Sequence, residues 1–255
     1  MFHKLEFVMI IRFYLMENIM PTVFVTGANR GLGFEHVKQY ANKDWEIIAC
    51  SRNPDQSEDL LELCEQFPNN IIVEKLDVTD FDAVNDLSQK YSDKPIDILI
   101  NNAGTLGPKG VPEAMGYQNI GHMDFEIWRD ILEVNLLAPF KVATAFHDQV
   151  AMSEMKILIM MSSDLGSVEQ NNFGGLYSYR TSKAGLNILS KGMSIDWNDI
   201  TVIALAPGWC KTYLGGEEAE IEADVSVAEQ QKMFESINPD DSGKFLDRFG
   251  NKVPW

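Results

Sequence analysis

A glycine-rich turn between a short apolar strand and a helix is the feature that most constrains the fold. Residues 22–26 read Thr-Val-Phe-Val-Thr, an apolar and β-branched run that is typical of a buried strand. Residues 26–33 read Thr-Gly-Ala-Asn-Arg-Gly-Leu-Gly, and apolar side chains then recur at helical spacing as far as Ala41. Glycines let the backbone turn tightly and approach a pyrophosphate, whose charge is favoured at a helix N-terminus. The turn therefore predicts a dinucleotide-binding strand–loop–helix unit, the alternative being a glycine-rich turn without a ligand.

The same alternation of strand and helix continues to the C-terminus. Strands are expected at residues 47–51, 71–74, 96–100, 156–161, 201–206 and 244–246. Helices are expected near residues 34–41, 57–67, 80–92, 177–197 and 226–237, with one long helix marked by Phe125, Trp128, Ile131 and Leu132. Strands that are apolar on both faces and alternate with helices form parallel sheets covered on both sides. The sequence predicts the α/β class, as a single-domain, Rossmann-type, doubly wound parallel sheet of about seven strands with helices on both faces.

Length and composition favour one domain over residues 20–255. The chain has 255 residues, of which 45% are hydrophobic and 23% charged, a composition typical of a globular domain. No internal repeat, linker or break in composition divides it. We interpret residues 1–19 as an N-terminal leader outside the fold. Its apolar stretch, residues 7–16, is too short to span a bilayer and contains an arginine, so no membrane insertion is expected.

The charge balance excludes several classes of partner. The chain carries 21 Lys and Arg against 38 Asp and Glu, a formal net charge of −17 at pH 7. Nucleic acids and anionic membrane surfaces are bound through basic charge, so neither is expected as a partner. Cys50, Cys64 and Cys210 lie far apart, which is typical of reduced thiols in a cytoplasmic protein. The four histidines show no ligand spacing, and we therefore expect no metal site.

The end of the second strand indicates which dinucleotide is bound. A protein that prefers NAD places a carboxylate there, about 20 residues past the glycines, to accept from the ribose hydroxyls. Residues 50–53 read Cys-Ser-Arg-Asn, and no acid follows until Asp55. The Arg52 guanidinium can pair with a 2′-phosphate, and Arg30 in the glycine turn lies toward the same corner. The pattern predicts NADP(H) rather than NAD(H), the alternative being two solvated surface arginines.

A tyrosine and a lysine four residues apart carry the strongest catalytic signal. Tyr179 and Lys183 share one face of the helix predicted at 177–197. An ammonium near a phenol lowers the phenol pKa, so the pair can exchange a proton with a carbonyl or alcohol oxygen. A tyrosine and a lysine at this spacing occur on many helices by chance. Here, however, Ser162 and Ser163 directly follow the fifth predicted strand, at the same edge of the sheet. A hydroxyl there can hydrogen-bond the substrate oxygen.

A series of landmarks resembles the short-chain dehydrogenase/reductase family in both order and spacing. They are the turn at 26–33, Asp77-Val78, Asn-Asn-Ala-Gly at 101–104, Asn135, Ser163, Tyr179 with Lys183, and Pro207-Gly208. The resemblance extends from about residue 21 to the C-terminus. Within the family, residues 179–183, 207–212 and 241–255 resemble the branch that contains the C-factor proteins and the Sniffer-type carbonyl reductases.

The resemblance implies a catalytic role for four residues. Tyr179 would be the acid–base group, and Lys183 would bind the nicotinamide ribose while lowering the Tyr179 pKa. Ser163 would orient the substrate carbonyl, and Ser162 is the less favoured choice on the family's usual spacing. Asn135 would kink its helix and hold a water that relays protons to Lys183.

The resemblance also implies a cofactor site along the carboxyl ends of the strands. The phosphates would lie on the glycine turn, the adenine beside residues 77–78, the adenosine ribose at residues 101–104 and the carboxamide against residues 207–212. The residues expected to bind the cofactor are Gly27, Arg30, Gly31, Leu32, Gly33, Arg52, Asp77, Val78, Asn101, Ala103, Gly104, Tyr179, Lys183, Pro207, Gly208, Cys210 and Thr212. Two features depart from the family: Cys210 stands where valine is common, and the gap between Ser163 and Tyr179 exceeds the usual spacing.

Together these observations predict an NADP(H)-dependent oxidoreductase that reduces an aldehyde or ketone to an alcohol by hydride transfer, with Tyr179 as the general acid. We expect a small-molecule carbonyl or alcohol substrate and a homodimer or homotetramer. The alternative is a dinucleotide-binding signalling protein of the C-factor type, in which reduction is incidental. Loss of Tyr179 or Lys183 would favour that alternative, and both residues are present.

Overall fold

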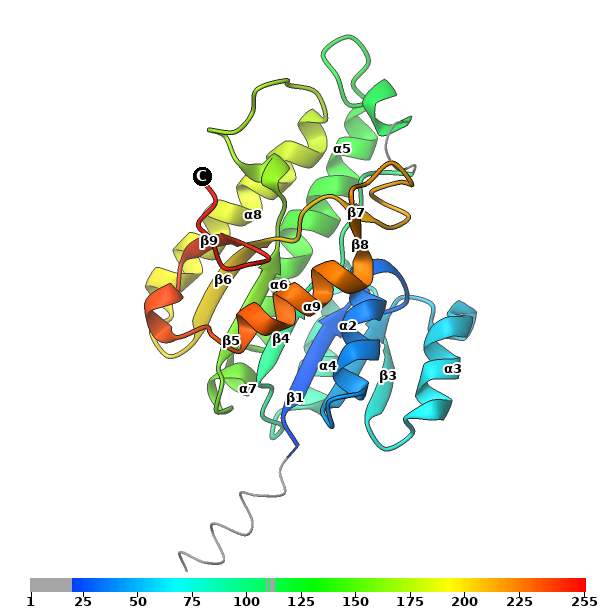
Figure 1. Ribbon diagram of the computed structural model, residues 1–255, viewed down its shortest axis with the longest axis vertical. Coiled ribbons are helices and arrows are strands. Elements are labelled where there is room, and N and C mark those ends of the chain that lie inside the picture. The colour runs from blue at the N-terminus through cyan, green and yellow to red at the C-terminus, as the bar shows by residue number, and fades with distance from the viewer. Residues whose placement is uncertain (1–19, 109, 111–112) are drawn as a thin grey trace, which may run out of the picture.

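Seven parallel strands form one sheet in the computed structural model, which describes residues 20–108, 110 and 113–255 (Figure 1). Their order is β3-β2-β1-β4-β5-β6-β9, so the winding reverses between β1 and β4. The strands are β1 (Thr22–Thr26), β2 (Glu46–Ser51), β3 (Ile71–Lys75), β4 (Ile98–Asn101), β5 (Ile157–Met161), β6 (Thr201–Ala206) and β9 (Lys244–Asp247). The predicted Rossmann-type doubly wound sheet is confirmed.

Helices cover both faces of the sheet. On one face lie α2 (Gly31–Ala41), α3 (Glu58–Gln66) and α9 (Ala223–Phe234), whose buried residues share one apolar cluster with the strands. On the other lie α4 (Phe81–Lys90), α6 (Ala138–Ala145) and α8 (Tyr177–Asp196). The helix α5 (Phe125–Leu132) packs against α8, and α7 (His147–Ala151) follows α6. The short strands β7 (Cys210–Lys211) and β8 (Ile221–Glu222) pair with each other.

Alternation of side chains along each strand fills both apolar layers. In β1, Val23 and Val25 belong to the layer under α2, α3 and α9, whereas Phe24 belongs to the layer under α4, α6 and α8. Neighbouring β2 repeats the pattern with Ile47 on the first side and Ile48 on the second. Successive side chains of a strand point to opposite faces, so a strand buried on both sides must be apolar throughout. This is why continuous apolar runs in the sequence marked the strands.

The long helix predicted around Phe125 to Leu132 is interrupted further along the chain. After α5 ends at Leu132, residues 133–137 form a π-helical turn that contains Asn135, and α6 begins at Ala138. Single π-helical turns inside helical segments are frequent at functional sites. The irregularity expected at Asn135 is therefore present in the structure.

Other boundaries differ from the predicted ones. The last helix spans Ala223–Phe234 rather than 226–237, because Asp224 suits the first turn of a helix and the residues before Pro239 are not suited to continue one. Strand β4 begins at Ile98 rather than at 96, since the Ile96 N–H donates to the Gln149 carbonyl and not to a neighbouring strand. The short elements α7, β7 and β8 were not predicted, because so few residues carry no periodic signal.

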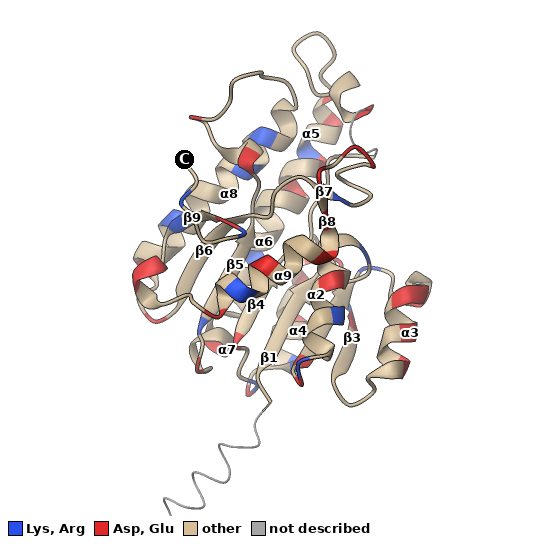
Figure 2. Ribbon diagram, in the orientation of Figure 1, with Lys and Arg blue, Asp and Glu red and all other residues tan. Residues whose placement is uncertain are grey.

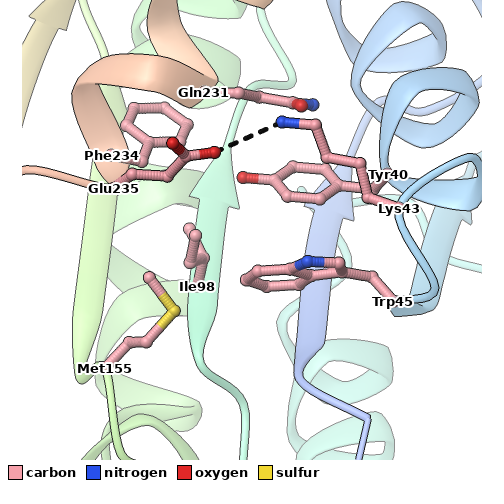
Figure 3. Close-up of a pocket in the computed structure, with 8 residues that line it drawn as sticks. All are labelled: Tyr40, Lys43, Trp45, Ile98, Met155, Gln231, Phe234 and Glu235. Carbon is pink, nitrogen blue, oxygen red and sulfur yellow. Dashed lines mark hydrogen bonds and ion pairs between the residues drawn. The ribbon is translucent and has the colours of Figure 1, made fainter.

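Two hollows lie at the amino ends of the strands, on the edge opposite the glycine turn. The smaller one, between α2 and α9, has a volume of about 20 Å³, room for about one water. It is lined by Tyr40, Lys43, Trp45, Ile98, Met155, Gln231, Phe234 and Glu235 (Figure 3). A groove of about 680 Å³ adjoins it at the start of β5 and β6. Sheets of this kind bind ligands at the carboxyl ends of their strands, so we place the candidate site at the other edge.

Among the described residues, no helix is long and apolar enough to cross a membrane. The segment interpreted as a leader, residues 1–19, lies outside the described part of the chain.

Candidate active site

The glycine turn joins β1 to α2 at the carboxyl edge of the sheet. Gly27 and Gly31 have φ values of +65° and +57°, in the left-handed region that glycine adopts without strain. At Gly33 an added Cβ would lie 2.2 Å from the Gly27 carbonyl oxygen, so the start of α2 packs directly on the turn. The first amides of a helix, here including that of Leu32, have no acceptor within it and are available to a phosphate. The turn therefore fits a pyrophosphate.

Asn102 fixes the turn from the neighbouring strand. Its Nδ2 donates to the carbonyl oxygens of Thr26 at 2.9 Å and of Gly27 at 3.2 Å. Asn101, which we expected at the ribose floor, instead turns its amide into the core and donates to the Pro139 carbonyl at 3.1 Å. The contact of Asn102 with the turn was not predicted from the sequence. The paired asparagines were a signal, but only the structure shows which of them faces the turn.

Ser163, Tyr179 and Lys183 meet at the carboxyl end of β5. Ser163 lies two residues beyond the strand, and the other two side chains come from the first turns of α8. The Ser163 hydroxyl lies close enough to the Tyr179 phenol to lower its pKa, and the Lys183 ammonium lies 5.7 Å from the centre of the phenol ring. Tyr179 is 7% exposed and Lys183 is 4% exposed. The structure thus brings the predicted serine, tyrosine and lysine together, with the tyrosine and the lysine buried.

Burial sets the protonation state of this group. Loss of hydration raises the pKa of Tyr179 to about 12, while the Ser163 hydroxyl lowers it and the charge of Asp164 raises it. Burial also lowers the pKa of Lys183 to about 8. Desolvation is the largest of these effects on Tyr179, and the expectation that Lys183 lowers the Tyr179 pKa stays a prediction. At neutral pH Tyr179 is a protonated phenol, the form that donates a proton.

Ser162 is turned away from this group. Its hydroxyl is buried and donates to Asn187 Oδ1 at 2.6 Å. Ser163 is half-buried, and its Oγ accepts from the Leu165 N–H at 3.2 Å, which caps a short 3₁₀ turn (Asp164–Gly166). Of the two serines, Ser163 is the one whose hydroxyl affects the pKa of Tyr179.

Asn135 ties the chain beyond β4 to the catalytic helix. Its Oδ1 accepts from the Thr105 N–H and its Nδ2 donates to the Thr105 carbonyl, each at 2.8 Å. The same Nδ2 donates to Ser182 Oγ on α8 at 3.0 Å. An added Cβ at Gly104 would lie 3.4 Å from Asn135 Oδ1 and 3.6 Å from Lys183 Nζ. Asn135 and Lys183 therefore both lie beside Gly104.

The segment after β6 reaches back to the glycine turn. Pro207 and Cys210 are buried, and Gly208 has a φ of +84°. An added Cβ at Gly31 would lie 3.4 Å from the Thr212 methyl, so Thr212 lies against the turn. Burial raises the pKa of the Cys210 thiol, which makes it a protonated filler rather than a reactive thiolate.

Two arginines lie where the adenosine end of a dinucleotide is expected. Arg30 precedes α2, and its guanidinium lies 4.5 Å from the centre of the Tyr213 ring. Arg52 follows β2, and Cys50 near the end of β2 is paired with Thr26 at the end of β1. Both arginines therefore lie at the carboxyl edge of these two strands. Within the described part of the chain, neither forms an ion pair with a carboxylate, whereas the arginines at 129 and 248 do. Two exposed and unpaired guanidinium groups suit a phosphate.

The surroundings of these arginines are otherwise acidic. Figure 2 shows acidic residues, coloured red on the ribbon, along α3 and on the segment that leads into β8. After β3, Asp77 Oδ1 accepts from the N–H and the hydroxyl of Thr79, and Val78 is buried. On the same edge, the Ala103 N–H donates to Thr26 Oγ1 at 3.0 Å. These residues line the edge between the ends of β1, β3 and β4.

A small apolar cluster includes Tyr179. Its members come from the loops after β4, β5 and β6: Leu106, Ala114, Tyr117, Leu165, Leu176, Tyr179 and Leu214. Apolar walls with a few fixed polar groups are typical of sites for small organic molecules.

Comparison with known proteins assigns the family. A family model described as short chain dehydrogenase matches residues 21–223. The chain belongs to the short-chain dehydrogenase/reductase family. It is therefore a member of a family of oxidoreductases, and the resemblance stated from the sequence is confirmed.

Individual relatives place the chain near the C-factor and Sniffer branch. C-signal of Myxococcus xanthus is 33% identical over 163 residues, which cover 63% of this chain and 93% of that protein. Carbonyl reductase Sniffer of D. melanogaster is 29% identical, with a TM-score of 0.82 over 93% of this chain and 100% of that one. A short-chain dehydrogenase/reductase from Burkholderia multivorans with bound NADP is 28% identical, with the same TM-score and coverage.

Replacing Lys183 by methionine should raise stability at pH 7. A pKa lowered from 10.5 to about 8 corresponds to roughly 3 kcal/mol of destabilisation at about 1.4 kcal/mol per unit. The hydrogen bond from Lys183 Nζ to the Met161 carbonyl, 2.7 Å long, offsets about 1 kcal/mol of it. The variant should therefore melt about 4–8 °C higher at pH 7.

The sign of the pH dependence follows from linkage. Between the folded pKa of about 8 and the ordinary value of 10.5, the unfolded lysine holds a proton that the folded one has lost, so wild-type stability rises with pH. The advantage of the Lys183→Met variant should therefore shrink across that interval. Melting curves at several pH values measure it, and an advantage that does not vary with pH would contradict a buried, depressed Lys183.

Proposed function

We propose that this short-chain dehydrogenase/reductase reduces an aldehyde or ketone to an alcohol with NADPH. The observation that carries the proposal is the buried, protonated Tyr179 in contact with Ser163 and Lys183, next to a turn that fits a pyrophosphate. A buried phenol that is neutral at pH 7 is a proton donor, which favours reduction of a carbonyl over oxidation of an alcohol. The bound cofactor would supply the hydride.

Each residue of the site would have its own role in the reaction. Ser163 would hydrogen-bond the substrate carbonyl oxygen and align it with Tyr179, which donates the proton. Lys183 would bind the nicotinamide ribose, and Asn135 would connect it to a water for reprotonation. Holding the carbonyl between a fixed hydroxyl and a fixed acid removes much of the entropic cost of reaching the transition state.

The preference for NADPH is supported by the two unpaired arginines. Arg30 and Arg52 flank the carboxyl edge of β1 and β2, where an NAD-binding protein places a carboxylate. The bound NADP in the structurally similar Burkholderia multivorans protein supports the same choice. The apolar cluster around Leu106 and Leu176 supports a small carbonyl compound with an apolar body as substrate.

Turnover tests the proposal directly. The purified chain should oxidise NADPH, followed by loss of its near-ultraviolet absorbance, with at least one member of a panel of aldehydes, ketones, diketones and quinones. NADH should be a poorer donor. Tight binding of NADPH without turnover of any panel member would favour the alternative, a dinucleotide-binding signalling protein of the C-factor type. The cytoplasmic location and the homodimer or homotetramer stay predictions from the sequence.

A further inference from the structure

The helix that carries Tyr179 begins without a cap of its own. At its N-cap position stands Leu176, an apolar residue with a left-handed φ of +48° and no side-chain hydrogen bond to the helix. The two glycines before it, Gly174 and Gly175, also have positive φ. The first amides of a helix need acceptors from outside it, and a buried amide without one is costly. The chain around Leu176 does not supply them with a side chain.

Gln118, from the loop ahead of α5, supplies the acceptors instead. This residue is fully buried. Its backbone carbonyl accepts from the Tyr177 N–H at 3.0 Å, and its side-chain Oε1 accepts from the Tyr179 N–H at 3.0 Å. The same Oε1 accepts from the Ser178 hydroxyl. One residue that is distant in the sequence therefore supplies acceptors to two of the first amides of the catalytic helix and to the hydroxyl of the residue between them.

The other end of the Gln118 amide holds the loop after β4. Its Nε2 donates to the Leu106 carbonyl at 2.6 Å. A backbone N–H only donates and a carbonyl only accepts, so Tyr179 and Leu106 together fix the orientation of the amide. Gln118 thus joins the loop that lines the apolar cluster to the helix that carries the acid.

Together with the bonds of Asn135 and Ser182, these hydrogen bonds form a closed ring of contacts around the backbone of Tyr179. Leu106 follows Thr105, whose N–H and carbonyl both bond to Asn135. Asn135 bonds to Ser182, and the Ser182 hydroxyl donates to the Tyr179 carbonyl at 2.7 Å. The backbone of Tyr179 is therefore held on its N–H side by Gln118 and on its carbonyl side by Ser182.

We propose that Gln118 is a positioning residue that fixes Tyr179 for proton donation, an inference that rests on the proposed reductase function. A fully satisfied buried network is rigid, and catalytic groups must be held within a fraction of an ångström of productive geometry. With the Gln118 amide removed, the Tyr179 N–H and the Ser178 hydroxyl lose this acceptor. Among the described residues, the Leu106 carbonyl then keeps only the donor that Tyr117 supplies, its hydroxyl at 3.2 Å. The first turn of α8 is then free to shift relative to Ser163.

The test separates loss of position from loss of stability. Gln118→Met keeps the length of the side chain but removes both ends of the amide, and it should lower kcat by about 10- to 100-fold. The dissociation constant for NADPH, measured by fluorescence titration, should stay within about threefold, because the hydrogen bonds of Gln118 among the described residues go to Leu106 and to residues 177–179 and not to the glycine turn. Gln118→Asn keeps the amide but is too short to reach both Leu106 and Tyr179, and it should show the same split. Gln118→Glu keeps the acceptor for Tyr179 and should recover much of kcat.

Gln149 provides a matched control. It is also a buried glutamine, and its Nε2 donates to the Ser88 carbonyl at 2.8 Å, near the amino end of β4. Gln149→Met should lower the melting temperature but leave kcat within about twofold of wild type. Retention of kcat in both Gln118→Met and Gln118→Asn would overturn the inference, as would an equal loss in Gln149→Met. If the wild-type chain turned over no carbonyl compound, the proposed function would fail first, so the two failures are distinguishable.

Discussion

Replacing Tyr179 by phenylalanine should lower kcat by about 10²–10⁴-fold, the usual contribution of one positioned general acid. The variant keeps the ring, so it preserves the packing of Tyr179 in the apolar cluster beside Leu106 and loses only the hydroxyl. NADPH binding should stay within about threefold, because the glycine turn and both arginines are intact. Single-turnover and steady-state rates with a reactive carbonyl, together with a titration of NADPH, measure the two effects.

Tyr177 offers a control on the same turn of α8. Its hydroxyl belongs to neither the ring around Tyr179 nor the contact with Ser163, so Tyr177→Phe should leave kcat within about twofold of wild type. Retention of more than about a tenth of the activity in Tyr179→Phe would contradict its assignment as the acid.

Replacing Arg52 by aspartate should reverse the cofactor preference. The substitution removes a guanidinium from the place expected for a 2′-phosphate and adds a carboxylate that repels it and can accept from the ribose hydroxyls of NADH. A charge-assisted hydrogen bond is worth about 1.5–3 kcal/mol, so kcat/KM for NADPH should fall at least about tenfold while that for NADH rises. The ratio of kcat/KM for the two cofactors is the quantity to measure.

Arg129→Asp makes the same change of charge far from the glycine turn. Arg129 lies on α5, where it is exposed and ion-paired with Glu126. Its replacement should leave the cofactor ratio within about twofold, since exposed charges are screened over about 8 Å at physiological ionic strength. An unchanged ratio in Arg52→Asp would mean that the Arg52 guanidinium points to solvent.

The structure also changes the pKa values expected for Tyr179 and Lys183. A lysine four residues after a tyrosine suggested a phenol activated by a nearby ammonium. Burial instead raises the pKa of Tyr179 to about 12 and lowers that of Lys183 to about 8. Sequence spacing gives the proximity of two groups on a helix but not their exposure to water. The direction of a pKa shift depends on both, and here desolvation is the larger effect.

Local signals in the sequence were sufficient to predict the sheet and the candidate site residues that lie next to its strands. The glycine turn, the buried strands and the Tyr179–Lys183 pair each depend on residues within a few positions of one another, because backbone conformation and side-chain periodicity are short-range properties. The parallel sheet then brings the carboxyl ends of its strands to one edge. That is why Ser163 and Tyr179 could be placed together without a structure.

Contacts between irregular loops were decided only by the tertiary structure. Gln118 lies in a segment with no helical or strand period, and nothing in its neighbours indicates that its amide caps α8. The same holds for Thr212 against Gly31 and for Asn102 on the glycine turn. A buried hydrogen bond between distant residues exists because packing removes both partners from water, and packing is a property of the whole fold rather than of any local run of sequence.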